Sequence, residues 1–183
     1  MENRENRIVK ILQGLLWMLL ATGGVLALLV TTNRLPLLVQ EDFPKQFASL
    51  DEAKHSVGLD TVLIPAYFPE GISWPPSFIF AQKRPYKVLV MEFKDTLLGT
   101  PTLIVIQSSM SGSVTQYQRI RLAVVKQETE YGLKGKKALL QIGTCENTMS
   151  CSQISWQDRG DSCTVLLMSS PFEVIKIAES MIH

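Results

Sequence analysis

Cysteine and histidine are the residues of this sequence best suited to chemistry, and their spacing limits what that chemistry is. Five residues separate Cys145 from Cys151, and eleven separate Cys151 from Cys163. This spacing fits no zinc or iron–sulfur pattern, which leaves a disulfide or unpaired thiols in a reducing compartment. His55 has no histidine or cysteine three or four residues away. We therefore interpret it as a surface or half-buried histidine and not as a metal ligand.

A strand register favours one particular disulfide. If Ile142 pairs with Ile154 across a hairpin loop, Cys145 falls opposite Cys151 and the bond closes the Thr144–Ser152 loop. So short a loop gives local rigidity more than global stability. Cys163 is then expected to be an unpaired thiol in the core.

Motifs for nucleophilic catalysis and phosphate binding are missing from the sequence. It contains no Gly-x-Ser-x-Gly elbow and no Ser-x-x-Lys pair. The segment Gly132–Lys137 lacks the spacing and the hydroxyl residue of a phosphate loop, so we interpret it as a turn. We therefore expect no catalytic residue, no metal and no cofactor, and the sequence predicts a protein that is not an enzyme.

The segment that positions everything else is the uncharged stretch 11–33, ILQGLLWMLLATGGVLALLVTTN. As a helix it would reach about 34 Å, enough to cross a hydrocarbon core of about 30 Å. It is longer than the core of a cleaved signal peptide and no Ala-x-Ala site follows it, so we favour an uncleaved anchor over a signal peptide.

The charges around this stretch predict its orientation and the domain boundaries. Arg4, Arg7 and Lys10 precede it, against Arg34 and Lys45 after it, which places the N-terminus in the cytoplasm by the positive-inside rule. We expect a cytoplasmic tail at 1–10, a transmembrane helix at 11–33, a linker at 34–46 and an extracytoplasmic domain at 47–183, in the plasma (inner) membrane. The net charge of +1 argues against nucleic acid as a partner.

Two helices and a set of short strands are predicted for the domain. Ser49 to Glu52 form a capping box for a short helix that Gly58 ends, with Leu50, Ala53 and Val57 as its apolar stripe. Ser170 caps a final helix, with Glu173 completing a second capping box and with an apolar stripe at Phe172, Ile175, Ala178 and Ile182, widened by Val174, Ile177 and Met181. Alternating patterns bounded by turn residues predict strands at Thr61–Ile64, Ser77–Gln82, Lys87–Lys94, Thr102–Gln107, Arg119–Lys126, Lys137–Ile142, Ser152–Trp156 and Cys163–Met168.

Three details of these strands are testable. Lys87–Lys94 has two largely apolar faces and is expected to be covered on both sides. In Arg119–Lys126, alternation puts Ile120, Leu122 and Val124 on one face and leaves the other wet. The turn Asp158–Asp161 pairs residues whose numbers sum to 319, so Trp156 faces Cys163. The fold class is α+β: an N-terminal transmembrane helix, then a single domain of largely antiparallel sheet with a short N-terminal helix and a C-terminal packing helix.

Several segments in this order resemble a bacterial extracytoplasmic domain family of unknown function, found in anti-sigma-factor-like and lipoprotein-carrier-like membrane proteins. The resemblance implies an extracytoplasmic fold without established catalytic residues. Only ten residues precede the apolar stretch, so we do not expect direct binding of a sigma factor. The segments that carry it are the opening helix with Leu63–Gly71, then Val90–Phe93, Leu103–Gln107, Lys134–Ala138, Ile154–Gly160 and Ile177–Ser180.

Two places in the chain are candidates for binding other molecules. Tyr67, Phe68 and Trp74 form an aromatic and proline-rich cluster that is either a partner surface or, for Tyr67 and Phe68, a plug at one end of the sheet. Gly23 and Ala27 are a small-xxx-small pair that permits close helix packing. We therefore expect an accessory subunit of a larger membrane complex, with other membrane-protein subunits as partners. The alternative is an envelope sensor or carrier-like domain that binds a lipid, peptide or lipoprotein.

Overall fold

The computed structural model describes residues 13–25, 45–59, 61–109, 119–146 and 148–182, which belong to two compact units, Met1–Phe43 and Pro44–His183. In the first unit a helix covers residues 13–25, inside the predicted span 11–33; the other residues of that span lie outside the described part. Among the described residues, no helix has both the length and the hydropathy needed to cross a membrane.

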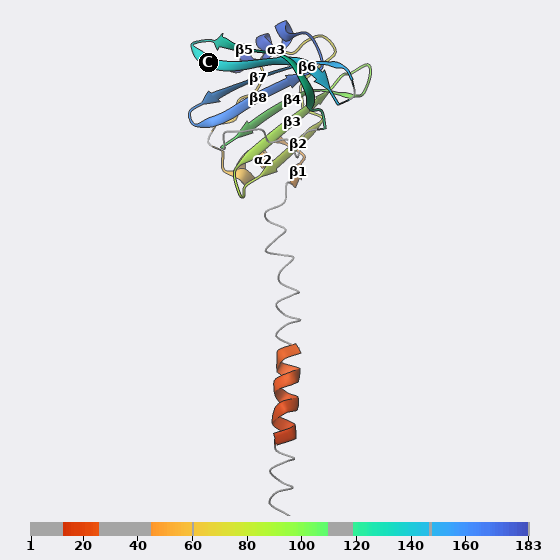
Figure 1. Cartoon of the computed structure of the whole chain (residues 1–183), viewed down its shortest axis with the longest axis vertical. Coiled ribbons are helices and arrows are strands. Elements are labelled where there is room, and N and C mark those ends of the chain that lie inside the picture. The colour runs from red at the N-terminus through yellow and green to blue at the C-terminus, as the bar shows by residue number, and fades with distance from the viewer. Residues whose placement is uncertain (1–12, 26–44, 60, 110–118, 147, 183) are drawn as a thin grey trace, which may run out of the picture. The chain divides into compact units, whose positions relative to one another are not determined.

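The second unit is an α+β fold built on one antiparallel sheet, in which the structure describes eight strands (Figure 1). Hydrogen-bonded neighbours follow the order β1-β2-β3-β4-β8-β7-β6-β5. The antiparallel sheet and the C-terminal helix confirm the expected fold class at this level. The elements are β1 (Lys45–Phe47), α2 (Leu50–Val57), β2 (Phe78–Gln82), β3 (Val88–Lys94), β4 (Pro101–Ser108), β5 (Leu122–Leu133), β6 (Lys136–Cys145), β7 (Ser150–Asp158), β8 (Asp161–Leu167) and α3 (Pro171–Met181).

The hairpin of β7 and β8 has the predicted register. Trp156 pairs with Cys163, and the neighbouring pairs continue along both strands with the same sum. Arg159 and Gly160 both have positive φ, at 52° and 93°, which is the backbone that a two-residue hairpin turn requires. The alternation of each strand therefore sends Trp156 and Cys163 into the core.

Three strand predictions were wrong. Thr61–Ile64 is not a strand, because the buried side-chain amide of Gln107 takes the place of a neighbouring backbone: it accepts from Leu63 N (3.0 Å) and donates to Thr61 O (2.8 Å). Lys45–Phe47, assigned largely to the linker, pairs with β2 as edge strand β1. Strand β5 starts at Leu122 and runs to Leu133, well beyond the predicted end.

Both helices begin where the sequence predicts. Ser49 Oγ accepts from Glu52 N (3.2 Å), and Gly58 ends α2 in the left-handed conformation. Ser170 caps α3, but its hydroxyl accepts from Phe172 N, so the predicted capping box with Glu173 does not form there. The predicted stripe is also displaced: Phe172 is exposed, and the residues that α3 buries are Val174, Ile177, Ala178 and Met181.

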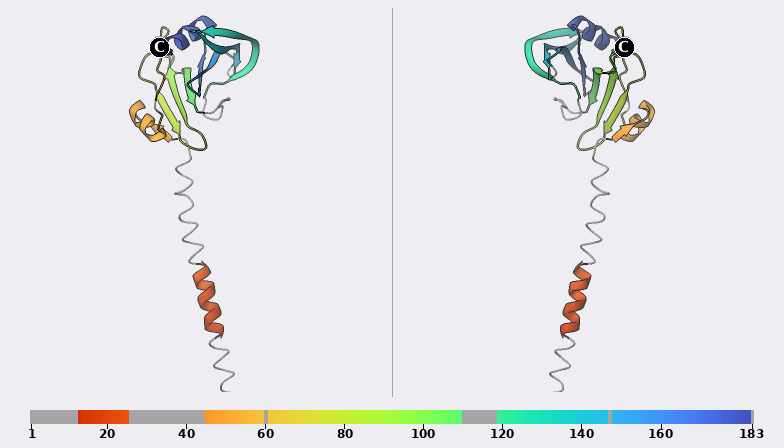
Figure 2. Two further views of the ribbon diagram at one scale, coloured as in Figure 1. Left: turned by 90° about the vertical axis from the view of Figure 1, so that its left-hand side faces the viewer. Right: turned by 90° about the vertical axis from the view of Figure 1, so that its right-hand side faces the viewer.

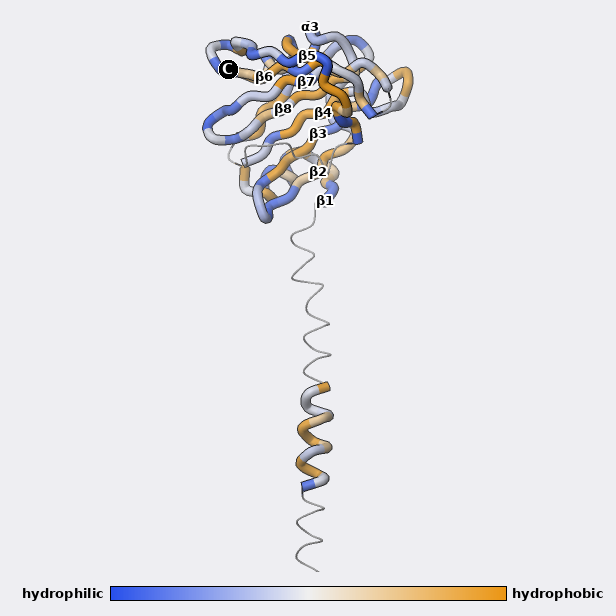
Figure 3. The backbone as a smooth tube through the Cα atoms, viewed as in Figure 1, coloured by the Kyte–Doolittle hydropathy of each residue, from blue (hydrophilic) through white to orange (hydrophobic). Residues whose placement is uncertain are grey.

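The two faces of the sheet carry different clusters. The helix face carries Leu89, Met91 and Phe93 of β3; α2 packs on it at β2 and β3, and α3 at β7 and β8 (Figure 2). The disulfide face carries Val88 and Val90, together with both disulfide cysteines. Strand β3 is thus covered on both sides as expected, and Figure 3 shows apolar residues concentrated along the central strands.

Strand β5 is irregular where it faces Gly143 of β6. Strand β5 has two register shifts against β6, between Leu122 and Val124 and between Val125 and Gln127. A Cβ on Gly143 would lie 1.8 Å from the Val124 carbonyl oxygen, so only glycine fits here. Such bulges increase the twist of a strand and interrupt its alternation. Val124 is consequently exposed, against the predicted inward face.

Candidate functional site

A pocket of about 690 Å³ opens where β4 and β5 begin and where β6 and β8 end, next to the disulfide. We call it the disulfide pocket. Most of its wall is apolar, and its charged residues are Arg119, Arg121 and Glu146. It is lined by Leu98, Thr100, Pro101, Arg119, Ile120, Arg121, Cys145, Glu146, Met149 and Met168.

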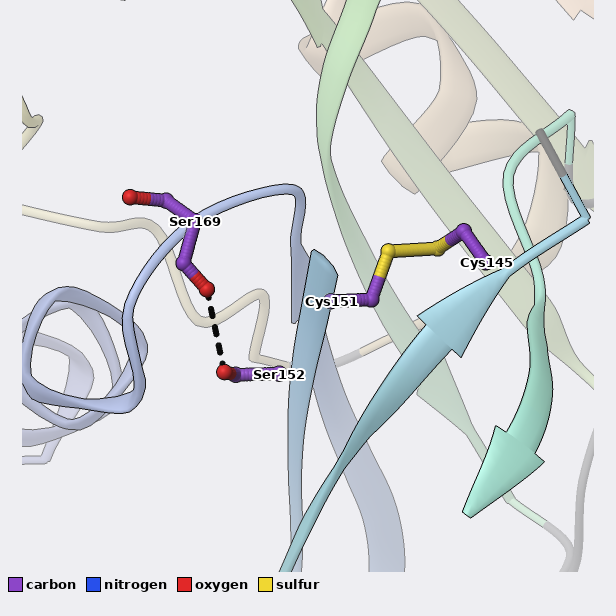
Figure 4. Close-up of a disulfide and its surroundings, with 4 residues drawn as sticks. All are labelled: Cys145, Cys151, Ser152 and Ser169. Carbon is purple, nitrogen blue, oxygen red and sulfur yellow. Dashed lines mark hydrogen bonds between the residues drawn. A yellow bond between two sulfur atoms is a disulfide. The ribbon is translucent and has the colours of Figure 1, made fainter. Parts of the chain in front are cut away.

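The disulfide joins Cys145 at the end of β6 to Cys151 near the start of β7, with 5.6 Å between the Cα atoms (Figure 4). The pairing is the predicted one, but the predicted register was wrong. Ile142 pairs with Ser152 and Gly143 with Cys151, so the two cysteines are joined diagonally and not as direct cross-strand partners. On the helix side of β7, Ser152 Oγ donates to Ser169 O (3.0 Å), which fixes the chain beyond β8.

The turn between β3 and β4 carries two exposed leucines, of which Leu98 lines the pocket. Leu97 is 90 % exposed and Leu98 is 72 % exposed. The turn is nevertheless well ordered, because one carboxylate oxygen of Asp95 accepts from Leu97 N (2.8 Å) and from Leu98 N (2.9 Å). In addition, Thr96 N donates to Gly71 O (2.7 Å). These bonds fix the backbone of the turn with both apolar side chains exposed to water. Exposed turn residues are normally polar.

Arg119 crosses the disulfide face and fixes the start of β5. Its guanidinium stands 4.0 Å above the centre of the Phe78 ring, and its Nη1 lies 3.6 Å from Glu92 Oε1. Glu92 is only 1 % exposed, and this oxygen has no hydrogen-bond partner. Burial raises the pKa of Glu92, and the opposite charges of Arg119 and Lys94 act against that rise. A half-exposed arginine above a buried carboxyl therefore forms one wall of the pocket.

The predicted aromatic cluster divides into packed and exposed members. Tyr67 and Phe68 are half-buried against the core of the helix face, as in the plug alternative, and Phe68 lies 5.2 Å from the ring of Phe93. Tyr67 Oη donates to Glu173 Oε2 (2.6 Å); this bond raises the pKa of Tyr67 and lowers that of Glu173. Trp74 is 45 % exposed, and its ring centre lies 6.3 Å from that of Phe93.

The other predicted residues lie apart from the pocket. Cys163 is a buried free thiol, and burial raises its pKa to about 12. His55 is exposed on α2. Gly23 lies in the helix over 13–25, whereas Ala27 lies outside the described residues. Within the described part of the chain, no three His, Cys, Asp or Glu residues are grouped closely enough to hold a metal ion.

Sequence reasoning did not single out the charged and apolar residues of this pocket. Two signals for them were present. Glu92 is the only acidic residue of β3 and is flanked by apolar residues on both sides, and Leu97 and Leu98 interrupt a turn whose other residues are polar or glycine. The contact of Arg119 with β3 left no local signal, because it depends on the curvature of the sheet.

Comparison with known proteins found no relative. No protein-family model matches the chain, and neither a curated protein nor a solved structure matches it.

Proposed function

We propose that this chain is a non-enzymatic, single-pass membrane protein whose extracytoplasmic domain binds another protein, as an accessory subunit of a larger membrane complex. The observation that carries the binding role is the disulfide pocket, whose lining includes the exposed Leu98. Apolar residues fixed in water beside an apolar pocket are typical of a protein-binding surface.

The membrane anchor in this proposal rests on the sequence. Residues 11–33 carry no charge, and the basic residues before them favour a cytoplasmic N-terminus. The disulfide supports the same topology, because disulfides persist in oxidising compartments outside the cytoplasm. The sequence resemblance to extracytoplasmic domains of membrane proteins is in keeping with it.

The carrier-like alternative requires a deep apolar cavity between the sheet and the terminal helix. The space between α3 and the sheet is instead filled with side chains. Val174 and Ile177 of α3, and Val165 of β8, are completely buried. We therefore prefer protein binding to the transport of a lipid by this domain.

The complex is tested by extracting the full-length chain from its native membrane in mild detergent and measuring its size and its co-purifying proteins. We expect a stoichiometric complex, and Gly23→Leu with Ala27→Leu should release the chain from it, since small residues allow close helix packing. Gly14→Leu is the matched control, because Gly14 lies nine residues before Gly23 and so about half a turn round the helix. A chain that is monomeric on extraction would contradict the proposal.

Topology is tested separately with right-side-out vesicles and added protease. The domain should be digested while the N-terminus stays protected. A protected domain would overturn the proposed orientation, and with it the extracytoplasmic location of the disulfide.

A further inference from the structure

We propose that the outer edge of β5 binds an extended segment of a partner protein, which adds an antiparallel strand to the sheet and carries basic side chains at alternate positions. This edge is a different surface from the disulfide pocket, and its binding does not depend on that pocket. Strand addition is a common mode of peptide recognition, because backbone hydrogen bonds supply affinity and alternate side chains supply specificity.

Strand β5 ends the sheet, and its outer edge has no neighbouring strand among the described residues. It is hydrogen-bonded to β6 alone, and the hairpin of these two strands forms a margin of the domain in Figure 2. The strand at the other end of the sheet, β1, has 3 residues, whereas β5 has 12. Very short edge strands limit unwanted pairing. The long free edge of the described sheet is therefore at β5.

Water surrounds this strand on more than its edge. All side chains of residues 123–130 are exposed, whichever face of the sheet they point to. A strand in a folded domain normally buries at least one face. The far end of β5 is nevertheless held in place, because Leu133 is completely buried and Tyr131 Oη lies 3.5 Å from Glu179 Oε1 of α3. The domain thus presents an ordered strand with both faces and one edge open to solvent.

The hairpin turn determines which backbone groups of β5 point outward. Leu133 pairs with Lys136 on either side of a two-residue turn, in which Lys134 and Gly135 have φ of 45° and 84°. The residues that flank such a turn bond to each other, and bonded and non-bonded pairs then alternate along the hairpin. The residues that direct their N–H and C=O away from β6 are therefore Glu128, Glu130 and Gly132.

Features that protect an edge from pairing occur in only one half of β5. Natural edge strands are protected by bulges, lysines and prolines. Both register shifts of β5 and its one lysine, Lys126, lie before Gln127. Residues 127–133 pair regularly with β6 and include no lysine or proline. This regular half, which contains the three outward-directed residues, is therefore where another strand can pair.

The charges on this half favour a basic occupant. Glu128 and Glu130 lie two residues apart, so they share a face of β5, and both are exposed. Glu128 accepts from Gln141 Nε2 of β6 (2.7 Å), a neutral donor. Lys137 is one strand further in, where it pairs with Gly132. A lysine or arginine of the added strand, directly opposite either glutamate, would form an oppositely charged cross-strand pair.

A second copy of this chain is the competing occupant of the edge. Two β5 strands aligned antiparallel and centred on these residues place Glu128 opposite Glu130, or one of the two opposite its own copy. Like charges directly opposite each other are destabilising. The edge therefore disfavours self-association and favours a different, basic partner.

The test uses the full-length chain in phosphatidylcholine nanodiscs, and as probe a short fluorescent peptide in which lysine alternates with valine. We expect saturable binding by fluorescence anisotropy, none to empty nanodiscs, and none of a peptide with glutamate in place of lysine. N-methylation of the lysines should abolish binding, because the residues opposite Glu128 and Glu130 direct their amides toward β5. N-methylation of the valines should leave binding unchanged, because those amides point away.

A charge reversal on the strand tests the selectivity. Glu130→Lys should weaken binding of the lysine peptide by about tenfold or more, because it places like charges opposite each other. Asp51→Lys is the matched control: Asp51 is an exposed acidic residue of α2, which packs at the other end of the sheet, and this variant should bind as wild-type does. Full binding by Glu130→Lys would overturn the proposal.

Hydrogen exchange of the wild-type chain locates the peptide without any variant. With the lysine peptide bound, the amide protons of Glu130 and Gly132 should exchange about tenfold more slowly or less, whereas that of Thr129 is already bonded to β6. Unchanged exchange at Glu130, or binding that survives N-methylation of the lysines, would overturn the proposal. Exchange at Glu130 that slows as the concentration of the chain rises, with no peptide present, would overturn it in favour of a second copy.

Discussion

Trp156 provides a sharp test of the core, because its side chain is buried in an apolar cluster while its indole nitrogen has no hydrogen-bond partner. Burying a tryptophan removes about 200 Å² from water, worth about 5 kcal/mol. Alanine keeps a small part of this, so Trp156→Ala should lower the free energy of unfolding by about 3–5 kcal/mol.

Phenylalanine at this position tests the nitrogen separately. Trp156→Phe loses part of the buried ring area, about 1–2 kcal/mol. It also removes a buried N–H without an acceptor, which recovers about 1–3 kcal/mol. The two effects nearly cancel, so Trp156→Phe should be close to wild-type in stability.

Chemical denaturation of the full-length chain in mild detergent, followed by circular dichroism, measures both variants. Phe172→Ala is the control, because truncating a largely exposed aromatic side chain should cost less than about 1 kcal/mol. If Trp156→Phe destabilises the protein as much as Trp156→Ala does, the indole nitrogen has a partner and the reasoning fails. A loss below about 1 kcal/mol for Trp156→Ala would refute the assigned packing.

Three further predictions concern ionisation and the cysteines. Burial raises the pKa of Glu92 above its ordinary 4.5, so its contribution to stability is present below that pH and is lost as the pH rises through the folded-state pKa. The free energy of unfolding of Glu92→Gln should therefore rise relative to that of wild-type when denaturation is measured at increasing pH. Cys163, with its pKa raised to about 12, should stay unreactive toward Ellman's reagent at mildly alkaline pH until the chain is unfolded, and reaction of the native protein would contradict its burial. Replacing Cys145 and Cys151 by alanine should lower the free energy of unfolding by about 2 kcal/mol, whereas an unchanged denaturation midpoint would mean that the bond adds no stability.

Local patterns in the sequence were enough for the hairpin of β7 and β8 and for the helix caps. Gly160 fixes the hairpin turn, and strict alternation then determines which residues face the core. Ser49 and Ser170 mark helix starts by a hydrogen bond within one turn. Each of these signals depends only on residues close together in the chain.

The errors occur where distant residues decide the outcome. Thr61–Ile64 has the composition of a strand, but the side chain of Gln107 takes the hydrogen bonds that a neighbouring strand would make. The apolar face of α3 is wide enough to pack in two orientations, and contacts with the sheet choose the one that exposes Phe172. The disulfide was predicted correctly from an incorrect register, because its side chains span the pair diagonally.

The candidate site was predictable only in part. The sequence was enough to identify the disulfide and Trp74. The pairing of Arg119 with Glu92 was not predicted, because it joins residues that are far apart in the order of the strands. The strand β5 that follows Arg119 is bulged opposite Gly143, and this glycine was the one local sign of the irregularity. The periodicity of a sequence predicts which face of a strand is buried, but it does not predict contacts between strands that are far apart in the sheet.

Because Gly143 lies so close to the backbone of β5, the packing of the two backbones helps to determine the width of the pocket. Both walls are attached to the same bend: Arg121 precedes the bulges of β5, and Cys145 follows Gly143 on β6. Any side chain at residue 143 would push the two strands apart at this point. The size of the chamber can therefore be altered, in descent or by design, by moving a bulge along β5, with every residue that lines the pocket left as it is.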